Sequence, residues 1–322
     1  MKLKIVSTGL ALPPTIETAA DLAPRVGRSE QWIISRTGVK ERRISHEPLE
    51  VLGARAARVA LGDGPPPDLI LNASASPKQV LPDTSVFIAR ELGYDGIPCH
   101  SVHATCLSFL VALQTAAAFL NTGMYKRILI VSTEKASITR NWDEPESAVL
   151  LGDGAAAVVV ELPKEGEDSA ILAHKMTTHP QGIELTQVRG GGTFRHPNDP
   201  ETKPEDNLFT MHGPGIYRMA RRRVADLLKD IFATAGLPLN DTSMDLVIPH
   251  QASGMAVAAV SRYGFPEERV INLVSQYGNT IAASLPMALA HAHQNGRLSR
   301  GNRVLLLGTG AGLSVAATII RW

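Results

Sequence analysis

The stretch HSVHATCLSFLVALQTAAAFLNTG, from His100 to Gly123, joins a short strand-like segment, a cysteine and an apolar, alanine-rich segment. Apolar residues recur at helical spacing from Leu107 to Asn121, which predicts a helix that begins directly after Cys106. A buried strand followed at once by such a helix is typical of α/β proteins. We therefore expect the sulfur of Cys106 to lie at a helix N-terminus.

Strand-like runs of β-branched and aliphatic residues lie on both sides of this stretch, mostly beside Gly, Pro or Asn. These runs are Lys4–Ser7, Asp68–Asn72, Arg127–Ser132, Ala155–Glu161, Leu246–Pro249, Val270–Leu273, Arg303–Gly308 and Ser314–Arg321. Alanine-rich helices are predicted between them, at Leu107–Asn121, Tyr217–Ala235, Met255–Tyr263 and Ile281–Asn295. Continuously apolar strands that alternate with helices predict an α/β fold whose sheets are covered on both faces.

A polar link at Leu162–Asp168 divides the chain into two predicted halves, residues 1–165 with Cys106 and residues 166–322 with His250 and Asn279. Each half places a reactive type of residue between a strand and an alanine-rich helix. Residues 176–212 look irregular, and they fit an ordinary surface loop and a cover over a pocket about equally well.

Charge and cysteine content exclude several classes of protein. The 322 residues include 32 Lys and Arg against 31 Asp and Glu, so neither nucleic acid nor an anionic membrane is an expected partner. No apolar run approaches the roughly 18 residues that cross a bilayer. The two cysteines, Cys99 and Cys106, support neither a disulfide framework nor a metal site, and a cytoplasmic protein is expected.

Cys106 has two interpretations at this point. The partial positive charge of a helix N-terminus favours the thiolate, which is the form that attacks a thioester. A single cysteine before an apolar helix is, however, more often a small buried core residue.

Two further residues occupy comparable junctions. His250 closes the strand of DLVIPHQAS, and the carboxyl ends of buried strands are where α/β proteins often build their sites. Asn279, in SQYGNTIAASLP, precedes a predicted helix and also suits a cap or a left-handed turn. Three such junctions can converge on one pocket.

The glycine-rich segment LLLGTGAGLSVAA lacks the following Lys-Ser or Lys-Thr of a phosphate loop. It fits a close approach of the backbone to a site. Backbone N–H groups of Gly310 and Ala311, together with that of Cys106, are candidates for an oxyanion hole that stabilises tetrahedral intermediates of acyl transfer.

With these residues assembled, the chain resembles the β-ketoacyl-acyl-carrier-protein synthase III family over essentially its whole length. The match rests on the aligned cysteine and on four segments in the family's order: EQWIISRTGVKERRI (Glu30–Ile44), LLGDGAAAVVV (Leu150–Val160), IPHQA (Ile248–Ala252) and YGNTIAAS (Tyr277–Ser284). The resemblance implies a five-layered αβαβα thiolase fold built from two similar halves, and a homodimer.

The resemblance also implies a catalytic triad. Cys106 would carry the acyl group as a thioester, while His250 and Asn279 would hold the carbonyl of a malonyl thioester as it loses carbon dioxide. No permanently bound cofactor and no metal are expected, and the substrates are acyl-CoA, acyl-carrier-protein thioesters or both.

Further roles follow by the same resemblance. Trp32 and Arg36 match residues that bind coenzyme A, although a packed loop is an alternative explanation. Arg218 and Arg262 match positions that dock the acyl carrier protein. Arg221 and Arg222 extend this basic patch, which alternatively is a solvated helix face.

Three positions depart from the family. Pro145 and Met255 stand where relatives carry arginines, which puts two coenzyme A phosphate contacts in doubt and favours a donor presented on a carrier protein or in another pose. Leu81 stands where an aromatic residue often gates the acyl pocket at the dimer interface, so this position has room for a longer or branched primer unless neighbours refill it.

The leading hypothesis is therefore decarboxylative Claisen condensation of an acyl thioester with a malonyl thioester, in fatty-acid or secondary-metabolite biosynthesis. An alternative keeps the acyl-Cys106 intermediate but passes the acyl group to another acceptor without malonyl decarboxylation. A non-catalytic partner subunit is the third reading, and it gives no reason to keep the triad.

Overall fold

A five-stranded sheet carries the strand that leads to Cys106. The computed structural model describes residues 1–240 and 242–322. The strands, in the order β1-β7-β6-β4-β5, are β1 (Lys4–Ala11), β7 (Asp153–Glu161), β6 (Arg127–Lys135), β4 (Leu69–Asn72) and β5 (Cys99–Ser101). Strand β4 runs parallel to β5 and β6, whereas β7 runs antiparallel to β1 and β6.

A four-stranded sheet carries the strand that leads to His250. Its order is β11 (Leu246–Pro249), β12 (Arg303–Gly310), β13 (Ser314–Arg321) and β8 (Ala170–Thr178). Strands β11 and β12 are parallel, and the other two pairings are antiparallel. All strands of the first sheet precede the 162–168 link, and all strands of the second follow it.

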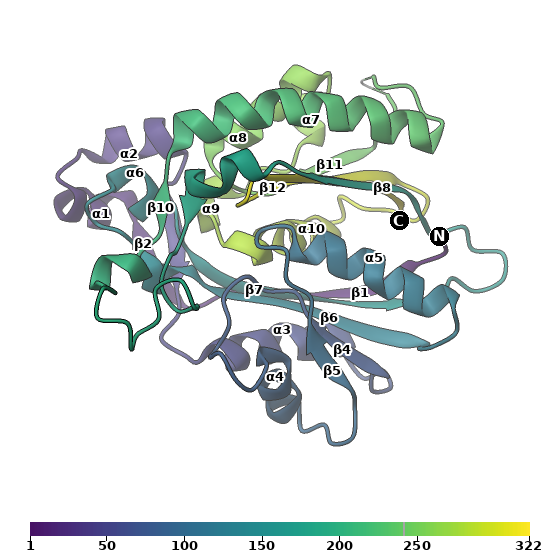
Figure 1. Ribbon diagram of the computed structural model, residues 1–322. Helices are drawn as coiled ribbons and strands as arrows, with labels where there is room; N and C mark the ends of the chain where they lie inside the picture. Colours follow the sequence, from purple (N-terminus) through teal and green to yellow (C-terminus); the bar gives the residue numbers. More distant parts are fainter. Residues whose placement is uncertain (241) are drawn as a thin grey trace.

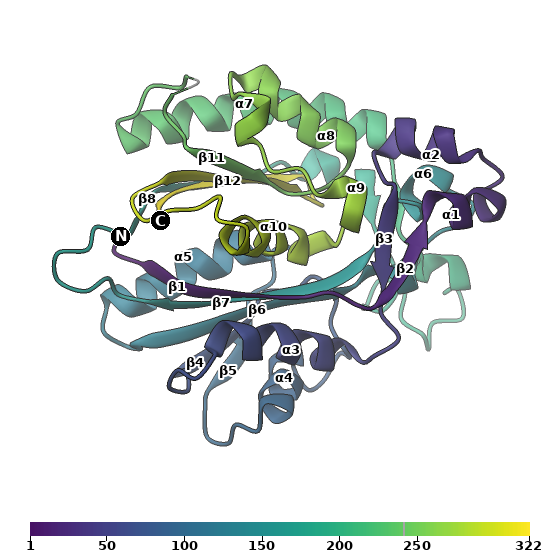
Figure 2. The ribbon, with the colours of Figure 1, turned by 180° about the vertical axis from the view of Figure 1, so that it is seen from behind.

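Helices separate and cover the two sheets (Figure 1). Helices α5 (Ser108–Asn121) and α10 (Ser284–Gln294) lie between the sheets, as both views show (Figure 2). Helices α3 (Leu49–Leu61) and α4 (Thr84–Leu92) cover the outer face of the first sheet, while α7 (Gly213–Ala235) and α8 (Gly254–Ala258) cover the second. These are the five αβαβα layers that the resemblance implied.

Strand β6 illustrates why its residues form a central strand. Ile128 and Ile130 face the core shared with α5 and α10, while Leu129 and Val131 face the core shared with α3. Because successive side chains point to opposite faces, a strand buried on both faces must be apolar at every position. The fully apolar run therefore places β6 inside the layered stack.

Shorter elements complete the chain. They are β2 (Thr15–Thr18), α1 (Ala19–Val26), α2 (Glu30–Thr37), β3 (Glu41–Ile44), η1 (Ala136–Thr139), α6 (Pro145–Ala148), η2 (Pro180–Leu185), β9 (Thr186–Gln187), η3 (Pro204–Asn207), β10 (Thr210–Met211), η4 (Ala259–Tyr263), η5 (Glu267–Arg269), α9 (Val274–Tyr277) and η6 (Ile281–Ala283). In the part of the chain that the structure describes, no helix is both long and apolar enough to span a membrane.

The structure corrects one predicted strand and subdivides two predicted helices. Residues Val270–Leu273 form only an isolated bridge to Val247, so the expected strand is absent. The helix predicted at Met255–Tyr263 consists of α8 followed by the 3-10 turn η4, and that predicted at Ile281–Asn295 consists of η6 followed by α10.

Residues 176–212 contain the end of β8 and several short elements rather than a structureless loop. The segment is attached at two points to the chain around α6. The N–H of Phe209 donates to the carbonyl of Thr139 at 2.7 Å, and the N–H of Met211 donates to the Glu144 carboxylate at 3.1 Å. Met211 also lines the cavity that contains His250 in its wall, so part of this segment forms a wall of that cavity.

Candidate active site

Cys106 lies between β5 and α5, directly before the residue that caps the helix. Thr105 has a φ of 50°, which is rare for a residue with a branched side chain. The N–H of Leu107 donates to the carbonyl of Ala104 at 3.0 Å, so the chain makes a tight turn at the cysteine. The predicted placement of the sulfur at a helix start is therefore confirmed.

The electrostatic expectation for Cys106 is wrong in direction. Burial, reinforced by the nearby negative charge of Glu134, raises the pKa of the Cys106 thiol to about 12. The N–H groups of Ala311 and of Cys106 itself point toward the sulfur and partly oppose this rise. Cys106 is thus a thiol in the resting protein, and its proton has to leave when it attacks.

Two glycines at the end of β12 allow the Cys106 and His250 segments to approach each other. A Cβ on Gly308 would lie 2.8 Å from the Leu107 side chain and 3.4 Å from the Cβ of His250. A Cβ on Gly310 would lie 2.7 Å from the Thr105 hydroxyl. Because real Cβ atoms do not approach so closely, the absence of side chains at these two positions is what permits the packing.

His250 follows β11 and is held by its backbone and its ring. Its N–H donates to the carbonyl of Leu307 at 2.7 Å, and its Nδ1 lies 2.5 Å from the hydroxyl of Ser284. The Ser284 oxygen also accepts the N–H of Gln251 at 3.2 Å, and its own hydrogen is available to donate to Nδ1. With the hydroxyl donating in this way, the imidazole proton is on Nε2.

Burial also fixes the charge of the ring. The His250 residue is 6% exposed, and this burial lowers the pKa of its imidazole to about 4. At neutral pH the ring is therefore uncharged, with Nε2–H as a hydrogen-bond donor and Nδ1 occupied by Ser284. His250 also lines the cavity described below.

Asn279 is fixed on both sides of its turn. Its N–H donates to the carbonyl of Leu150 at 2.7 Å, and its own carbonyl accepts the N–H of Gly152 at 3.1 Å. The side-chain Oδ1 accepts the N–H of Ile281 at 2.9 Å, which assigns Nδ2 to the other end of the amide. Nδ2 donates to the carbonyl of Ala252 at 3.3 Å, so the side chain reaches the His250 segment.

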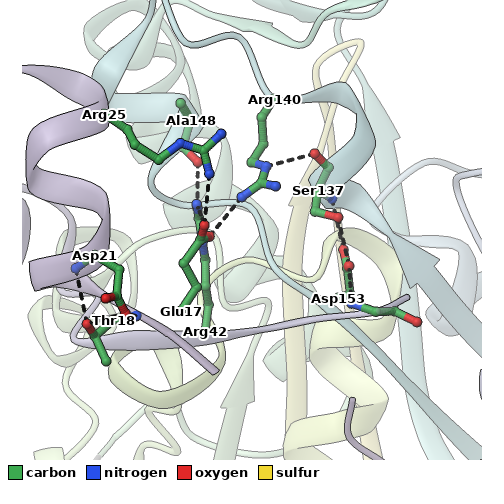
Figure 3. Close-up of polar contacts among 10 residues, drawn as sticks. Glu17, Thr18, Asp21, Arg25, Arg42, Ser137, Arg140, Ala148 and Asp153 are labelled. Carbon is green, nitrogen blue, oxygen red and sulfur yellow. Dashed lines mark hydrogen bonds and ion pairs between the residues drawn. The ribbon is translucent and has the colours of Figure 1, made fainter. Parts of the chain in front are cut away.

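A partly buried ionic network, the Glu17 cluster (Glu17, Arg25, Arg42 and Arg140), lies beside the chain that leads to Leu150 (Figure 3). Arg42 is completely buried, pairs with Glu17 at 2.8 Å and donates to the carbonyl of Ala148 at 2.5 Å. Ala148 lies two residues before Leu150, where the backbone that binds Asn279 begins. The cluster thus connects the Glu30–Ile44 and Leu150–Val160 segments structurally.

A neighbouring carboxylate holds the next residues of the same segment. Asp153 accepts the N–H groups of Ser45 and Ser137, each at 2.8 Å, and the Ser137 hydroxyl at 2.7 Å (Figure 3). Burial raises the pKa of Asp153, although these hydrogen bonds and Arg140 oppose the rise. Two of the four segments that carried the family resemblance therefore build the platform under Asn279.

Sequence reasoning missed Glu134, a completely buried carboxylate at the end of β6. It accepts the N–H of Ala75 at 2.5 Å and that of Ser76 at 3.1 Å, and it also accepts the Ser76 hydroxyl and the N–H of Ala282. Burial raises the pKa of Glu134 to about 7, although these hydrogen bonds oppose the rise. The available signal was a carboxylate shortly after the apolar run Ile128–Val131 of the same strand.

A mostly apolar cavity of about 520 Å³ extends from His250 between α7 and the α8–η4 segment. Its walls include backbone and aliphatic side chains, among them Leu150, Ile216, Val224, Ala252, Val260 and Leu307. Charged side chains from four elements also line it: Arg36, Glu146, Arg221 and Arg262. A mostly apolar cavity with an imidazole in its wall suits an extended, flexible substrate arm.

The residues predicted to bind coenzyme A occupy different surroundings. Arg36 lines the cavity and pairs with Glu146 at 2.8 Å, with both side chains more than two-fifths exposed. Trp32 packs against a small apolar cluster, with the Arg28 guanidinium 5.4 Å from its ring centroid. Among the described residues, the cavity lining includes Arg36 and not Trp32.

The predicted docking arginines lie on or beside the start of α7 and are exposed. Arg221 and Arg262 line the cavity, whereas Arg218 and Arg222 lie outside it. Arg262 donates to the hydroxyl of Tyr217 at 2.6 Å, which orients its guanidinium. Leu81 is 80% exposed and lies on the loop before α4, outside the cavity lining.

The described residues include no group of three or more His, Cys, Asp or Glu side chains that could hold a metal ion. The site instead consists of a thiol, a neutral imidazole, an amide and several backbone N–H groups. Such a set can stabilise negative charge that develops on a carbonyl oxygen and can form and break a thioester.

Comparisons with known proteins agree with this chemistry. Two family models match the chain: "3-Oxoacyl-[acyl-carrier-protein (ACP)] synthase III" at residues 101–180 and "3-Oxoacyl-[acyl-carrier-protein (ACP)] synthase III C terminal" at residues 233–322. A β-ketoacyl-[acyl-carrier-protein] synthase III from Desulfitobacterium hafniense is 35% identical over 99% of this chain and 97% of its own length. One from Erythrobacter litoralis is 35% identical over the full length of both chains.

Solved structures give the same result. The chain superposes on 3-oxoacyl-[acyl-carrier-protein] synthase III from Aquifex aeolicus with a TM-score of 0.89 and 32% identity, covering 99% of this chain and 100% of that one. The enzyme from Pseudomonas aeruginosa gives a TM-score of 0.89 at 28% identity, with 100% and 98% coverage. These likenesses confirm the thiolase fold. The chain therefore belongs to the 3-oxoacyl-[acyl-carrier-protein] synthase III family and is an acyltransferase that condenses acyl thioesters.

Proposed function

We propose that Cys106 takes an acyl group from a thioester and that this group is then condensed with a malonyl thioester to give a β-ketoacyl thioester, with His250 and Asn279 as the catalytic partners. The observation that carries the proposal is the N–H of Ala311 aimed at the Cys106 sulfur, next to a neutral imidazole that lines a substrate-sized cavity.

In the first step, the sulfur of Cys106 attacks the carbonyl carbon of the donor thioester. The new carbon–sulfur bond forms first and gives a tetrahedral intermediate, the bond to the donor sulfur then breaks, and the Cys106 proton goes to the departing thiolate. The N–H groups of Cys106 and Ala311, with Gly310 beside them, serve as the oxyanion hole for the tetrahedral intermediate. Because the thiol has a high pKa, this stabilisation matters more than a preformed thiolate.

In the second step, the malonyl thioester loses carbon dioxide and leaves an enolate. Nε2–H of His250 and Nδ2–H of Asn279 donate to the enolate oxygen, and the enolate carbon attacks the acyl-Cys106 carbonyl. The tetrahedral intermediate collapses to the β-ketoacyl thioester and the Cys106 thiolate, which takes up one proton. The neutral imidazole can act in this way because its Nδ1 is bonded to Ser284 and its Nε2 carries the proton that is donated to the enolate oxygen.

We further propose that the pantetheine arm of the substrate lies in the 520 Å³ cavity, with Arg36 and Trp32 contacting coenzyme A when that is the carrier. The Arg36 charge is already balanced by Glu146, so little positive charge remains for the coenzyme phosphates. This balance favours an acyl carrier protein as donor. Arg218, Arg221, Arg222 and Arg262 are the proposed docking residues for that acidic partner.

A homodimer is proposed on the basis of one sheet edge. Strand β5 is an edge strand, and the loop that follows β4 exposes 77% of Val80 and 80% of Leu81. Unpaired strand edges and large exposed apolar side chains are normally covered in the working protein. A second copy covering this edge would place Leu81 as the proposed gate of the acyl pocket.

We also propose a cytoplasmic location, since both cysteines are free thiols.

The direct test is intact-protein mass spectrometry with a panel of acyl-CoA and acyl-carrier-protein thioesters. We expect an acyl adduct on the wild type and none on Cys106→Ala, with Cys99→Ala as the matched control that keeps the adduct. Malonyl thioester added to the acylated protein should then release carbon dioxide and a β-ketoacyl product.

Two outcomes contradict the proposal. An absence of any Cys106-dependent adduct across the panel removes acyl-enzyme chemistry altogether. An adduct that is passed to another acceptor while the malonyl group stays intact replaces condensation with simple acyl transfer.

For the carrier surface, Arg221→Glu combined with Arg222→Glu should slow turnover with acyl-carrier protein much more than turnover with acyl-CoA.

A further inference from the structure

Glu134 joins three segments of the site that are remote in the sequence. Its carboxylate accepts backbone N–H groups from Ala75 and Ser76, on the loop after β4, and from Ala282, on η6. Ala282 belongs to the turn that begins at Asn279, whose Oδ1 accepts the N–H of Ile281. The Asn279 turn is thus closed by its own amide on one side and by Glu134 on the other.

The charge of Glu134 has no cationic partner. None of the ion pairs within residues 1–240 and 242–322 includes it, and its bonds come from backbone N–H groups and one hydroxyl. Its field therefore reaches the sulfur of Cys106, where the negative charge disfavours the thiolate. A carboxylate kept only for loop structure would gain from an arginine partner, as Glu17 does.

The other groups around Cys106 do not supply this effect. His250, directly after β11, is a titratable group close to the Cys106 segment, and it is uncharged above its low pKa. His103 lies on the same segment as Cys106 and is exposed. The 308–311 and 279–282 segments carry no ionisable side chain.

We propose that Glu134 is a positioning residue: its carboxylate ties the Asn279 turn to the loop after β4, and its unpaired negative charge acts on the nearby Cys106 sulfur. This inference rests on the proposed function, which assigns Cys106 and Asn279 their roles. Together with burial, which is the larger influence, this charge disfavours the thiolate, and the thiolate is the form that is alkylated and oxidised.

Two substitutions separate the two parts of this role. Glu134→Gln keeps the size of the side chain but removes the charge and one acceptor. Glu134→Asp keeps the charge and withdraws the carboxylate by one methylene. Glu50→Gln is the matched control, because Glu50 is also a buried carboxylate but pairs with Lys78 on the outer side of the first sheet.

Two readouts are measured on the full-length protein. The first is the pH dependence of Cys106 alkylation by iodoacetamide between pH 7 and pH 11, followed by mass spectrometry in a Cys99→Ala background. The second compares Cys106 acylation with the subsequent malonyl condensation. For Glu134→Gln we expect the alkylation profile to move down by roughly one pH unit. Condensation should fall about 30-fold or more, with acylation within threefold of the wild type.

For Glu134→Asp we expect an unchanged alkylation profile and a condensation rate that falls about tenfold. Glu50→Gln should change neither readout. The proposal is overturned if Glu134→Gln leaves the alkylation profile where it is, or if acylation and condensation fall equally, since both results describe only a structural residue. If Glu134→Gln does not fold, Glu134→Asp decides: equal loss in both steps overturns the proposal, and selective loss of condensation supports it.

The controls also separate this inference from the proposed function. A wild type that forms no Cys106 adduct contradicts the proposed function itself. A wild type that is acylated and condenses, beside a Glu134→Gln variant with the same rates and the same alkylation profile, contradicts only the role of Glu134.

Discussion

Two glutamates of the same half of the chain, Glu17 partly buried and Glu134 completely buried, are held in opposite ways. Glu17 is surrounded by the guanidinium groups of Arg25, Arg42 and Arg140, and although burial alone would raise its pKa, these charges leave it lowered. Glu134 has only N–H groups and a hydroxyl around it, and its pKa rises to about 7. The comparison shows that hydrogen bonds can satisfy a buried carboxylate geometrically without balancing its charge.

The difference matches the position of each residue. The Glu17 cluster contacts the chain before the Leu150–Gly152 backbone and does not touch the site residues. Its balanced charges therefore stabilise the fold without changing the reactivity of Cys106. Glu134 stands close enough to act on the nucleophile, so an unbalanced charge there changes reactivity. Ion pairs serve structure in the first case, and an isolated charge serves chemistry in the second.

The strongest way to break the comparison is Glu17→Gln. It leaves Arg42 completely buried without a carboxylate, so the free energy of unfolding should fall by about 3–5 kcal/mol at pH 7. Glu134→Gln, which removes a charge that had no partner, should cost less than half as much. Urea unfolding of both variants measures the difference, and equal losses would contradict the contrast.

Asn279→Ala tests the platform's purpose. Removing one of two donors to the enolate should lower malonyl condensation about 10²–10³-fold, whereas Cys106 acylation should stay within threefold of the wild type. Rapid-quench measurement of the two steps gives the answer. A parallel loss in both steps would mean that Asn279 serves the Cys106 segment rather than the enolate.

The contributions of Glu134 and Glu17 to the free energy of unfolding should change with pH in opposite directions. The folded pKa of Glu134, about 7, lies above its ordinary value of 4.5, so the folded protein binds the extra proton between these values. Its contribution to stability should decline by roughly 3 kcal/mol as pH rises from 4.5 to 7 and stay level above. Glu17 has a lowered pKa, so its contribution is complete above pH 4.5 and is lost as pH falls through that pKa.

The measurement for this prediction is the free energy of unfolding in urea at a series of pH values. Subtracting the Glu134→Gln curve from the wild-type curve should give a line that falls with pH up to about 7. Subtracting the Glu17→Gln curve should give a line that rises with pH in the acid range. Two difference curves of the same sign would be inconsistent with the assigned shifts.

The smallest expected effect concerns Ser284. Ser284→Ala removes the partner of His250 Nδ1, so the imidazole proton is no longer confined to Nε2, and condensation should fall about 5–10-fold. Ser243→Ala is a suitable control, because it removes a buried hydroxyl that bonds to Pro238 and Asn240 away from the site. Unaltered condensation in Ser284→Ala would mean that the tautomer is fixed elsewhere.

Local patterns predicted most of the fold. The apolar spacing after Cys106 predicted α5, and uninterrupted β-branched runs predicted β11 and β13 with their observed bounds. The prediction of a strand at Val270–Leu273 was wrong, because the Gln251 side chain makes backbone hydrogen bonds there that a neighbouring strand would otherwise make. The Gln251 amide accepts the N–H of Leu273 at 2.7 Å and donates to the carbonyl of Ile271 at 3.2 Å. No local pattern records such a distant partner.

The site was predictable only in part, for a similar reason. The positions of Cys106 and His250 at the ends of strands follow from local patterns, whereas Asn279 lies between α9 and η6 rather than at the predicted strand-to-helix junction. The surroundings of all three residues do not follow from local patterns. The thiol was expected to be acidic from its helix, whereas burial and Glu134 act in the opposite direction. Glu134 itself binds residues 75, 76 and 282, and only the folded chain brings these together.

The close packing of Gly308 and Gly310 against the Cys106 segment has a consequence for synthesis of the chain. Cys106 emerges from the ribosome long before His250, and later still comes the β12 end with Ala311, whose N–H faces the sulfur. A nascent chain therefore carries all strands of the first sheet before it has the Ala311 N–H of the proposed oxyanion hole or the His250 imidazole. If Cys106 is the nucleophile as proposed, it lacks these partners during translation and gains them only after the second sheet has formed.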